Sequence, residues 1–462
     1  MKKVVISILV LVILGGVFFI SSVYYVNKKI DAFFHDNDGV LYSSAGLKWN
    51  LTNAETTFFG GKYQTKISVY GETVLTLEHE ALFGTRFNAF SIGFIDTKGK
   101  VISTKKLPDL SGKEFGLKSK ITLSGIKTNI FIKSDSASNY NEYSDEYENL
   151  TWKDINADFF ISFQKDSLNF DAYIPFIKID DSNGNFFIAE EQKYKNRSNK
   201  KFGLWISDSD ISIEKIDANS ETVQFLLSKL NFETKVRPDK DSTLRNINKI
   251  SFAELKYINF YDESDLSLSD VVFNVNLENI DAESMQKMSE TISNIDPTNE
   301  EQAALAYLSF FGHISNIFAK HPKIVVEELS GKYSNQSGKI SGFVQYVGNS
   351  DFSNFDFVMK ADFEIARGMV EQIFRDKYKN YYDYDLEGDL DTDDEVDFKD
   401  RSDINEEYEK FDIENKVYSE MEYFENNLGI KDRNGVYQGT FEYKDGGFLL
   451  NGKPYEVDTN VF

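Results

Sequence analysis

The 462-residue sequence contains no cysteine. Its absence excludes disulfides, thiolate zinc sites, iron–sulfur clusters and a cysteine nucleophile. Basic residues are also scarce: 51 Lys and Arg stand against 75 Asp and Glu, which gives a net charge of −24. A phosphate backbone would be repelled by that charge, so we expect no nucleic-acid partner. The six prolines are few for this length, and strands can therefore run long without interruption.

Signatures of catalysis are missing as well. The sequence has no G-x-S-x-G elbow, and its paired glycines, Gly60-Gly61 and Gly446-Gly447, lack the Lys-Ser/Thr that follows a phosphate loop. Histidine is rare, and the four copies show no metal-ligand spacing: His35, His79, His313 and His321. The sequence therefore predicts a protein that is not an enzyme.

One long apolar run stands at the start of the chain. Residues 4–26 carry no charge, follow Lys2 and Lys3, and include Tyr24 and Tyr25 near their end. As a helix the run would be about 34 Å long, which is enough to cross a hydrocarbon core of about 30 Å. No A-x-A-like cleavage site follows it. We therefore predict a signal-anchor over residues 1–30 that makes a single pass through a bacterial inner membrane, with the bulk of the chain in the periplasm.

The aromatic residues favour strands. Phe (40) and Tyr (25) are abundant, and apolar side chains alternate with polar ones in three segments, Tyr63–Val69, Leu168–Phe176 and Val271–Leu277. A period of two, with one face buried and one solvated, is typical of antiparallel strands. Asn183-Gly184 predicts a hairpin turn.

Helical patterns occur mainly in the second half. Asp281 is placed to cap the helix that follows it, and Thr298 with Glu301 forms a capping box for a second helix that ends at His321-Pro322. Two more helices are predicted over residues 363–378 and 405–427. The predicted class is α+β: an N-terminal transmembrane helix, then a large, curved, antiparallel β-sheet with helical hairpins in the C-terminal half. The predicted regions are 1–30 (anchor), 31–264 (β-rich) and 265–462 (α+β, with two helical pairs and an acidic loop at 381–411).

Several segments resemble the YdgA-like family of bacterial inner-membrane-anchored proteins of unknown function. The resemblance rests on "GTFEYKDGGFLLNGKPYEV" at the C-terminus, on "DLSLSDVVFNVNLENIDAESMQKM" and "HPKIVVEELSGKYSNQSGKISGFVQYVG" upstream, and on the anchor with "GGKYQTKISV". Where that family often has His-Gly-Pro after its second strand, this chain has "HEALFG" at His79. The resemblance implies a membrane location and this architecture. It does not imply a particular activity, because the family has none that is established.

The acidic segment "DYDLEGDLDTDD" partly matches a calcium-binding EF-hand loop. Its glycine falls at position 6, but positions 5 and 12 hold Glu and Asp where a strong site has a shorter ligand and a bidentate Glu. Fourteen acids between residues 383 and 409 face only Lys399 and Arg401 among bases inside the segment. The alternatives are a calcium site, loose cation condensation and a solvated loop. The candidate ligands are Asp383, Asp385, Glu387, Asp389 and Asp394.

The apolar faces of the predicted strands carry the main functional expectation. Such a face is covered by helices or a second sheet, or it forms a groove for an amphiphile or an unfolded envelope protein. We expect a membrane-anchored periplasmic protein that binds or handles a lipid or another envelope component without catalysis. The alternative is a calcium-responsive interaction module that uses residues 383–394.

Overall fold

The computed structural model describes residues 40–44, 47–57, 60–69, 72–84, 93–104, 110–141, 146–164, 166–260, 264–293, 313–349, 356–388, 402–427, 430 and 432–455. The predicted anchor over residues 4–26 lies outside this set. Among the described residues, no helix has both the length and the apolar character needed to cross a membrane. The chain divides into two compact units: residues 1–220 with 285–312 form unit 1, and residues 221–284 with 313–462 form unit 2.

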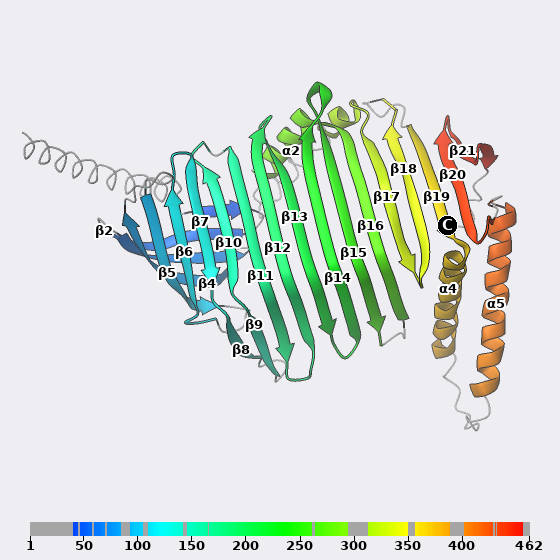
Figure 1. The fold of residues 1–462 in the computed structure, drawn as a ribbon, viewed down its shortest axis with the longest axis horizontal. Coiled ribbons are helices and arrows are strands. Elements are labelled where there is room, and N and C mark those ends of the chain that lie inside the picture. Colours follow the sequence, from blue (N-terminus) through cyan, green and yellow to red (C-terminus); the bar gives the residue numbers. More distant parts are fainter. Residues whose placement is uncertain are drawn as a thin grey trace, which may run out of the picture. The chain divides into compact units, whose positions relative to one another are not determined.

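Unit 1 is an antiparallel sheet in which most neighbours follow one another along the chain (Figure 1). The order is β1 (Val40–Ser44), β2 (Leu47–Thr57), β3 (Gly60–Val69), β4 (Glu72–Gly84), β5 (Gly93–Thr104), β6 (Glu114–Ile121), β7 (Gly125–Ile132), β10 (Ile155–Ser162), β11 (Ser167–Asp181), β12 (Phe186–Lys201) and β13 (Leu204–Asn219). The hairpin of β8 (Asp135–Asn141) and β9 (Glu146–Trp152) is inserted before β10, and β9 pairs with the end of β11. No pairing joins β1 to β13, so the described sheet of this unit is not closed.

Unit 2 is a second antiparallel arrangement with helices inserted between strands. Its strands pair in chain order: β14 (Val223–Pro238), β15 (Thr243–Asn259), β16 (Ser264–Asp281), β17 (Lys323–Tyr333), β18 (Gln336–Tyr346), β19 (Phe357–Ala366), β20 (Val436–Lys444), β21 (Gly447–Leu450) and β22 (Lys453–Tyr455). A short 3-10 turn, η1 (Lys240–Ser242), joins β14 to β15. Helix α2 (Ala282–Ser293) follows β16 and belongs to unit 1 from Met285 onward. Helices α4 (Arg367–Gly388) and α5 (Ser402–Asn427) are inserted between β19 and β20 (Figure 1). The predominance of antiparallel strands over helices confirms that part of the predicted class.

Three predicted strands and their turn are confirmed. Residues 63–69, 168–176 and 271–277 lie in β3, β11 and β16. Asn183 and Gly184 form the turn between β11 and β12, where Gly184 has a φ of 89°. The Asp181 carboxylate accepts hydrogen bonds from the Asn183 N–H (2.9 Å) and the Asn185 N–H (3.0 Å). This local side-chain to backbone bonding fixes the turn.

The predicted helices are confirmed in part. The Asp281 carboxylate accepts a hydrogen bond from the Ser284 N–H at 2.8 Å and so caps α2. Helix α5 contains the predicted segment 405–427. Thr298 and Glu301 lie outside the described residues, although residues 313–318 before His321 are helical.

The third predicted helix, over residues 363–378, starts four residues later in the structure than in the prediction. Residues 363–366 belong to β19, where Phe363 pairs with Ile340 on one side and Gly439 on the other. Phe363 and Ile365 alternate with Asp362 and Glu364, so the segment has the period of two that a strand requires. Helix α4 starts only at Arg367.

In the longest strands, the residues that are buried change from one parity to the other partway along the strand. In β12, Ala189 is buried, and so are Gln192 and Ser198, which have the opposite parity. Between them Glu191 has a left-handed φ of 51° and lies where β11 has Pro175, which cannot donate to the ladder. Lys229 in β14 and Asp270 in β16 have similar φ values of 52° and 50°. A strict alternation therefore fails beyond these positions.

The most deeply buried residues of unit 2 join its two long helices to the end of its sheet. Tyr437 on β20 is fully buried, and its hydroxyl donates to Glu425 at 2.6 Å. Around it lie Val370 of α4, Val417 and Met421 of α5, Ile430 and Leu450. The two helices are also joined by a bidentate contact between Arg375 and Glu414, with Nε at 2.9 Å. Packing at this cluster fixes where α4 leaves the sheet and where α5 returns to it.

Replacing Met421 tests this cluster. Its side chain is 3% exposed, and Met421→Ala should lower the free energy of unfolding of unit 2 by about 2–5 kcal/mol because it leaves a cavity. The control is Tyr418→Ala on the same helix, where the ring is 68% exposed and the expected change is within about 0.5 kcal/mol. Denaturant unfolding followed by circular dichroism measures both. Equal effects would mean that α5 is not docked through this cluster.

Candidate functional site

An apolar groove lies on one face of the sheet of unit 1. Its volume is about 470 Å³, and its walls come from strands that are distant in sequence. Apolar side chains form nearly all of the lining: Ile67, Leu75, Leu77, Val101, Leu110, Phe115, Leu117, Ile130, Ile132, Leu150, Trp152, Ile155 and Ile177. Cavities of this size and character are typical of small-molecule sites.

Cross-strand register assembles the groove. Thr65 of β3 pairs with Leu77 of β4, and Leu77 pairs with Val101 of β5. Further along the sheet Leu117 pairs with Ile130. Because successive residues of a strand point to opposite faces, these pairs place their side chains on one side of the sheet. The charged residues between them, among them Glu78 and Lys100, point to the other side.

Trp152 forms part of the wall at one end of the groove. It is 7% exposed, and its indole N–H donates to the Lys133 carbonyl at 2.7 Å. Trp152 pairs across strands with Ile177, which lies just beyond Pro175. The sequence alternation places Phe176 on the apolar face, but Ile177 lines the groove, while the Lys153 ammonium lies 5.1 Å from the Phe176 ring centroid.

His79 lies at the opposite end of the groove. Its Nε2 is hydrogen-bonded to the Thr65 hydroxyl at 3.0 Å, and its ring stacks on Tyr63 with centroids 5.5 Å apart. Burial lowers the pKa of His79 below its usual value of 6.5. The neutral imidazole is therefore the favoured form in the folded chain.

Phe115 lines the groove from β6, between His79 on β4 and Trp152 on β9. Its ring has room only because the residue opposite it is a glycine. Gly99 pairs with Phe115, and a Cβ at Gly99 would lie 2.2 Å from the Phe115 ring. The ring therefore occupies the space that a side chain at position 99 would need. On the other face, Phe131 lies over Gly116 in the same way, with a corresponding distance of 2.0 Å.

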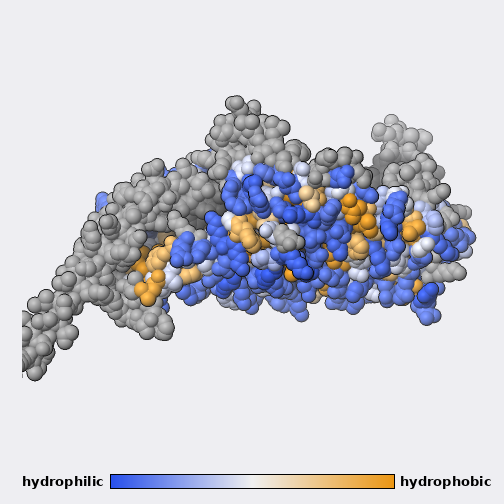
Figure 2. Space-filling view, turned by 90° about the horizontal axis from the view of Figure 1, so that it is seen from above, coloured by the Kyte–Doolittle hydropathy of each residue, from blue (hydrophilic) through white to orange (hydrophobic). Residues whose placement is uncertain are grey.

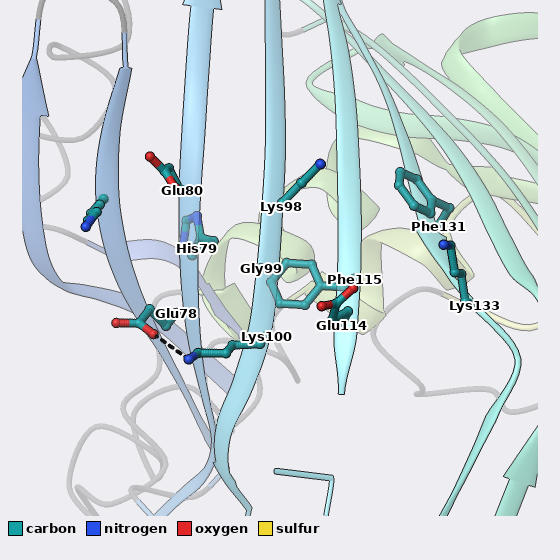
Figure 3. Close-up of a pocket in the computed structure, with 11 residues that line it drawn as sticks. Glu78, His79, Glu80, Lys98, Gly99, Lys100, Glu114, Phe115, Phe131 and Lys133 are labelled. Carbon is teal, nitrogen blue, oxygen red and sulfur yellow. Dashed lines mark ion pairs between the residues drawn. The ribbon is translucent and has the colours of Figure 1, made fainter. Parts of the chain in front are cut away.

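A second, charged cavity lies on the opposite face of the same strands. It has a volume of about 640 Å³ and shares His79, Glu114 and Phe115 with the groove. Its other lining residues are Lys62, Glu78, Glu80, Lys98, Gly99, Lys100, Phe131 and Lys133 (Figure 3). We call it the charged pocket. Glu78 and Lys100 form an ion pair at 3.5 Å, drawn as a dashed line in Figure 3.

The rim of the groove carries one further ion pair. The Lys113 ammonium lies 2.9 Å from the Asp135 carboxylate. Hydrogen bonds from Lys113 and from the Ser136 N–H lower the pKa of Asp135. Both side chains are partly exposed, so the pair orients the rim and contributes little to stability.

The residues predicted as calcium ligands are only partly described. Helix α4 extends to Gly388, so Asp383, Asp385 and Glu387 lie in its last turns, whereas Asp389 and Asp394 lie outside the described residues. Among the side chains that the structure describes, no group of three or more potential ligands could hold a metal ion. The calcium loop stays a prediction.

The groove was not visible in the sequence as a site. The alternation of residues 63–69 indicated one wall, and His79 was noted without a role, but Leu117, Ile130 and Trp152 were not singled out. Their signal is a short apolar pattern common to many strands. Only the pairing of strands brings them together.

The fold and its site define a class: an open antiparallel β-sheet protein with an apolar groove on one face of its first unit and a charged pocket on the other. Residues 113–458 match the family described as "Bacterial protein of unknown function (DUF945)", and this match covers more than half of the 462-residue chain. The chain belongs to the DUF945 family. No curated protein and no solved structure matches it.

The buried histidine predicts a pH-dependent stability. Because the pKa of His79 is lower in the folded chain than in the unfolded one, the unfolded chain takes up the proton first as the pH falls. Stability should therefore decline as the pH drops from about 7.5 to below the unfolded value of 6.5. His79→Gln, which retains a hydrogen-bonding group toward Thr65, should make this decline shallower.

Calorimetric melting temperatures at several pH values check the prediction, with His321→Gln as the control because His321 is exposed and lines neither cavity. A pH dependence that is the same in wild type and His79→Gln would contradict it.

Proposed function

We propose that this chain is an envelope protein that binds the hydrocarbon chain of an amphiphile in the apolar groove of unit 1. The observation that carries the proposal is the nearly uniform apolar lining of the groove. The hydrocarbon chain of an amphiphile has the same apolar character. Binding and release, without a covalent step, are the proposed activity.

The energetics of a hydrocarbon chain suit this groove. Each buried methylene group is worth roughly 0.8 kcal/mol, so about ten methylenes would contribute on the order of 8 kcal/mol before the costs of immobilisation. The lining offers few hydrogen-bonding groups, chiefly Thr65, His79 and the ends of Lys113 and Glu114. A polar ligand buried there would lose its hydrogen bonds to water without replacement.

The described surface of the chain carries exposed apolar side chains. Figure 2 shows hydrophobic patches between hydrophilic side chains on the face in view. Several large apolar side chains are more than a third exposed in unit 1, including Phe187, Phe202 and Trp205.

We further propose that residues 4–26 anchor the chain in a bacterial inner membrane, with the remainder in the periplasm. The support is the uncharged run in the sequence, the flanking Lys2 and Lys3, and membership of a bacterial family. A groove tethered beside a bilayer would be close to its ligands.

Photocrosslinking in living bacteria tests the groove. A photoreactive p-benzoylphenylalanine at position 77 or 117, in the full-length chain, should capture radiolabelled acyl chains after growth on labelled acetate, because both positions line the groove. The matched controls are positions 82 and 123, where Leu82 and Leu123 are 58% and 87% exposed and line neither cavity. Labelling that is absent at 77 and 117, or equal at all four positions, would reject the proposal.

A fusion to the C-terminus tests the location. Alkaline phosphatase needs disulfides that form in the periplasm, so a fusion after Phe462 should be active, and the equivalent β-galactosidase fusion should be inactive. The opposite pair of results would place the C-terminus in the cytoplasm.

A further inference from the structure

We infer that the amphiphile has an uncharged head, a hydroxyl or a carbonyl group, which hydrogen-bonds to the Thr65–His79 pair at one end of the groove. The inference rests on the proposed function, since it concerns the polar end of the molecule whose chain fills the groove. It adds the class of ligand and the direction in which the ligand lies.

The hydrogen-bonding side chains of the groove that are free of ion pairs lie at one end, where Thr65 and His79 meet. At the other end the lining comes from β9, β10 and β11. Among the described lining residues of these strands, the one polar group is the Trp152 indole N–H, and it donates to the Lys133 carbonyl at 2.7 Å. A head buried at that end would lose its hydrogen bonds to water without replacement. The polar end of a ligand therefore belongs at Thr65 and His79.

The imidazole of His79 is held in place by its neighbours. Its Nε2 lies 3.0 Å from the hydroxyl of Thr65, which is 5% exposed. The ring stacks on Tyr63, with centroids 5.5 Å apart, and its centroid lies 6.5 Å from that of Phe115. A side chain fixed in this way loses little conformational freedom when it binds a ligand.

The second ring nitrogen of His79, Nδ1, is available to a ligand. It has no hydrogen-bond partner among the described residues, and His79 is half-buried and lines the groove. When the Thr65 hydroxyl donates to Nε2, Nδ1 carries the proton and donates; when Nε2 donates to Thr65, Nδ1 accepts. The pair can therefore match either a carbonyl oxygen or a hydroxyl.

The described lining of the groove offers no free counter-charge to a charged head. The Lys113 ammonium at the rim already lies 2.9 Å from the Asp135 carboxylate. Burial lowers the pKa of His79, so that its imidazole is neutral at pH 7. Glu114 is exposed and pairs across strands with Lys100, on the charged face. A charged head buried beside His79 would lose its hydration without gaining an ion pair.

Strand register gives the bound chain its direction. One cross-strand row begins at His79 on β4 and continues through β5, β6, β7 and β10 with Gly99, Phe115, Ile132 and Ile155. At about 4.8 Å between neighbouring strands, this row is roughly 19 Å long. A chain whose head is bonded to His79 therefore lies across the strands, with its tail toward the Trp152 end of the groove.

The test uses the purified full-length chain in nonionic micelles, with the photoreactive residue at position 117, which lines the groove from β6. Four radiolabelled probes share one chain: oleyl alcohol, oleyl phosphate, oleyl trimethylammonium and 9-octadecene, which has no head. Saturation of crosslinking against mole fraction in the micelle gives an apparent Kd for each. Oleyl alcohol should bind about threefold or more tightly than octadecene, because it gains a hydrogen bond. It should bind about tenfold or more tightly than the two charged probes.

Substitutions at position 79 assign this preference to the Thr65–His79 pair. His79→Phe keeps a ring between Tyr63 and Phe115 but cannot hydrogen-bond, so oleyl alcohol should bind no more tightly than octadecene. His79→Gln has an amide that can donate and accept, and it should restore the preference for the alcohol. His321→Phe, at an exposed histidine outside both cavities, is the control and should keep the wild-type preference. An unchanged affinity for octadecene shows that a variant retains its groove, and the wild-type ranking of the four probes decides the inference where a variant does not.

A second pair of probes tests the direction of the chain. Hexadecanol that carries a diazirine next to the hydroxyl should label peptides of β3 and β4, whereas a diazirine at the far end of the chain should label peptides of β9 and β10. Mass spectrometry of the labelled wild-type chain identifies the peptides. The reverse assignment, or the same peptides from both probes, would overturn the inferred direction.

The outcomes separate the head from the groove. If the charged probes bind as tightly as oleyl alcohol, or if His79→Phe keeps the preference for the alcohol, the inferred head is wrong while the groove still binds chains. If no probe crosslinks, octadecene included, the proposed function itself fails.

Discussion

Cross-strand register in β3 to β7 is the constraint on which the rest of unit 1 depends. A strand alternates its side chains between two faces, so one fixed register sorts a mixed sequence into an apolar face and a charged face. Thr65, Leu77 and Val101 align on one side, and Lys62, Glu80 and Lys98 align on the other. A slip of one residue in β4 would move Leu77 to the charged face and Glu78 into the groove. The groove and the pocket are thus two consequences of one pairing.

Glycines allow each face of this thin sheet to hold an aromatic ring. Phe115 lies over Gly99 on the apolar face, and Phe131 lies over Gly116 on the charged face. Each ring covers backbone that would otherwise be exposed beside a residue without a side chain, and the Lys118 ammonium lies 5.5 Å from the Phe131 centroid. A side chain at position 99 would displace Phe115, which lines both cavities. The shape of the site therefore depends on Gly99 and Gly116, which have no side chain.

The sequence predicted local features well and assembled ones poorly. The strand at 63–69, the turn at Asn183-Gly184 and the Asp281 cap each follow from residues within a few positions of one another, and the structure confirms them. The predicted start of α4 was wrong because the apolar residues among 363–366 fit the spacing of a helix as well as that of a strand. Pairing with β18 and β20 makes this segment a strand. The groove could not be predicted because its walls extend from Thr65 to Ile177. Only strand order brings them together, and an acidic loop is more conspicuous in a sequence than scattered leucines.

The family match divides this site in an informative way. The match begins at residue 113, so Phe115, Leu117 and Trp152 fall inside it, whereas Leu77, Lys62 and Lys98 fall outside. The far wall of the groove is therefore built from the part of the chain that the family model matches, whereas the near wall is built from residues that precede it. The apolar face and the charged face of these strands can therefore vary independently. Side chains of β3 and β5 that point away from the groove, such as Lys62 and Lys98, can change without altering its lining.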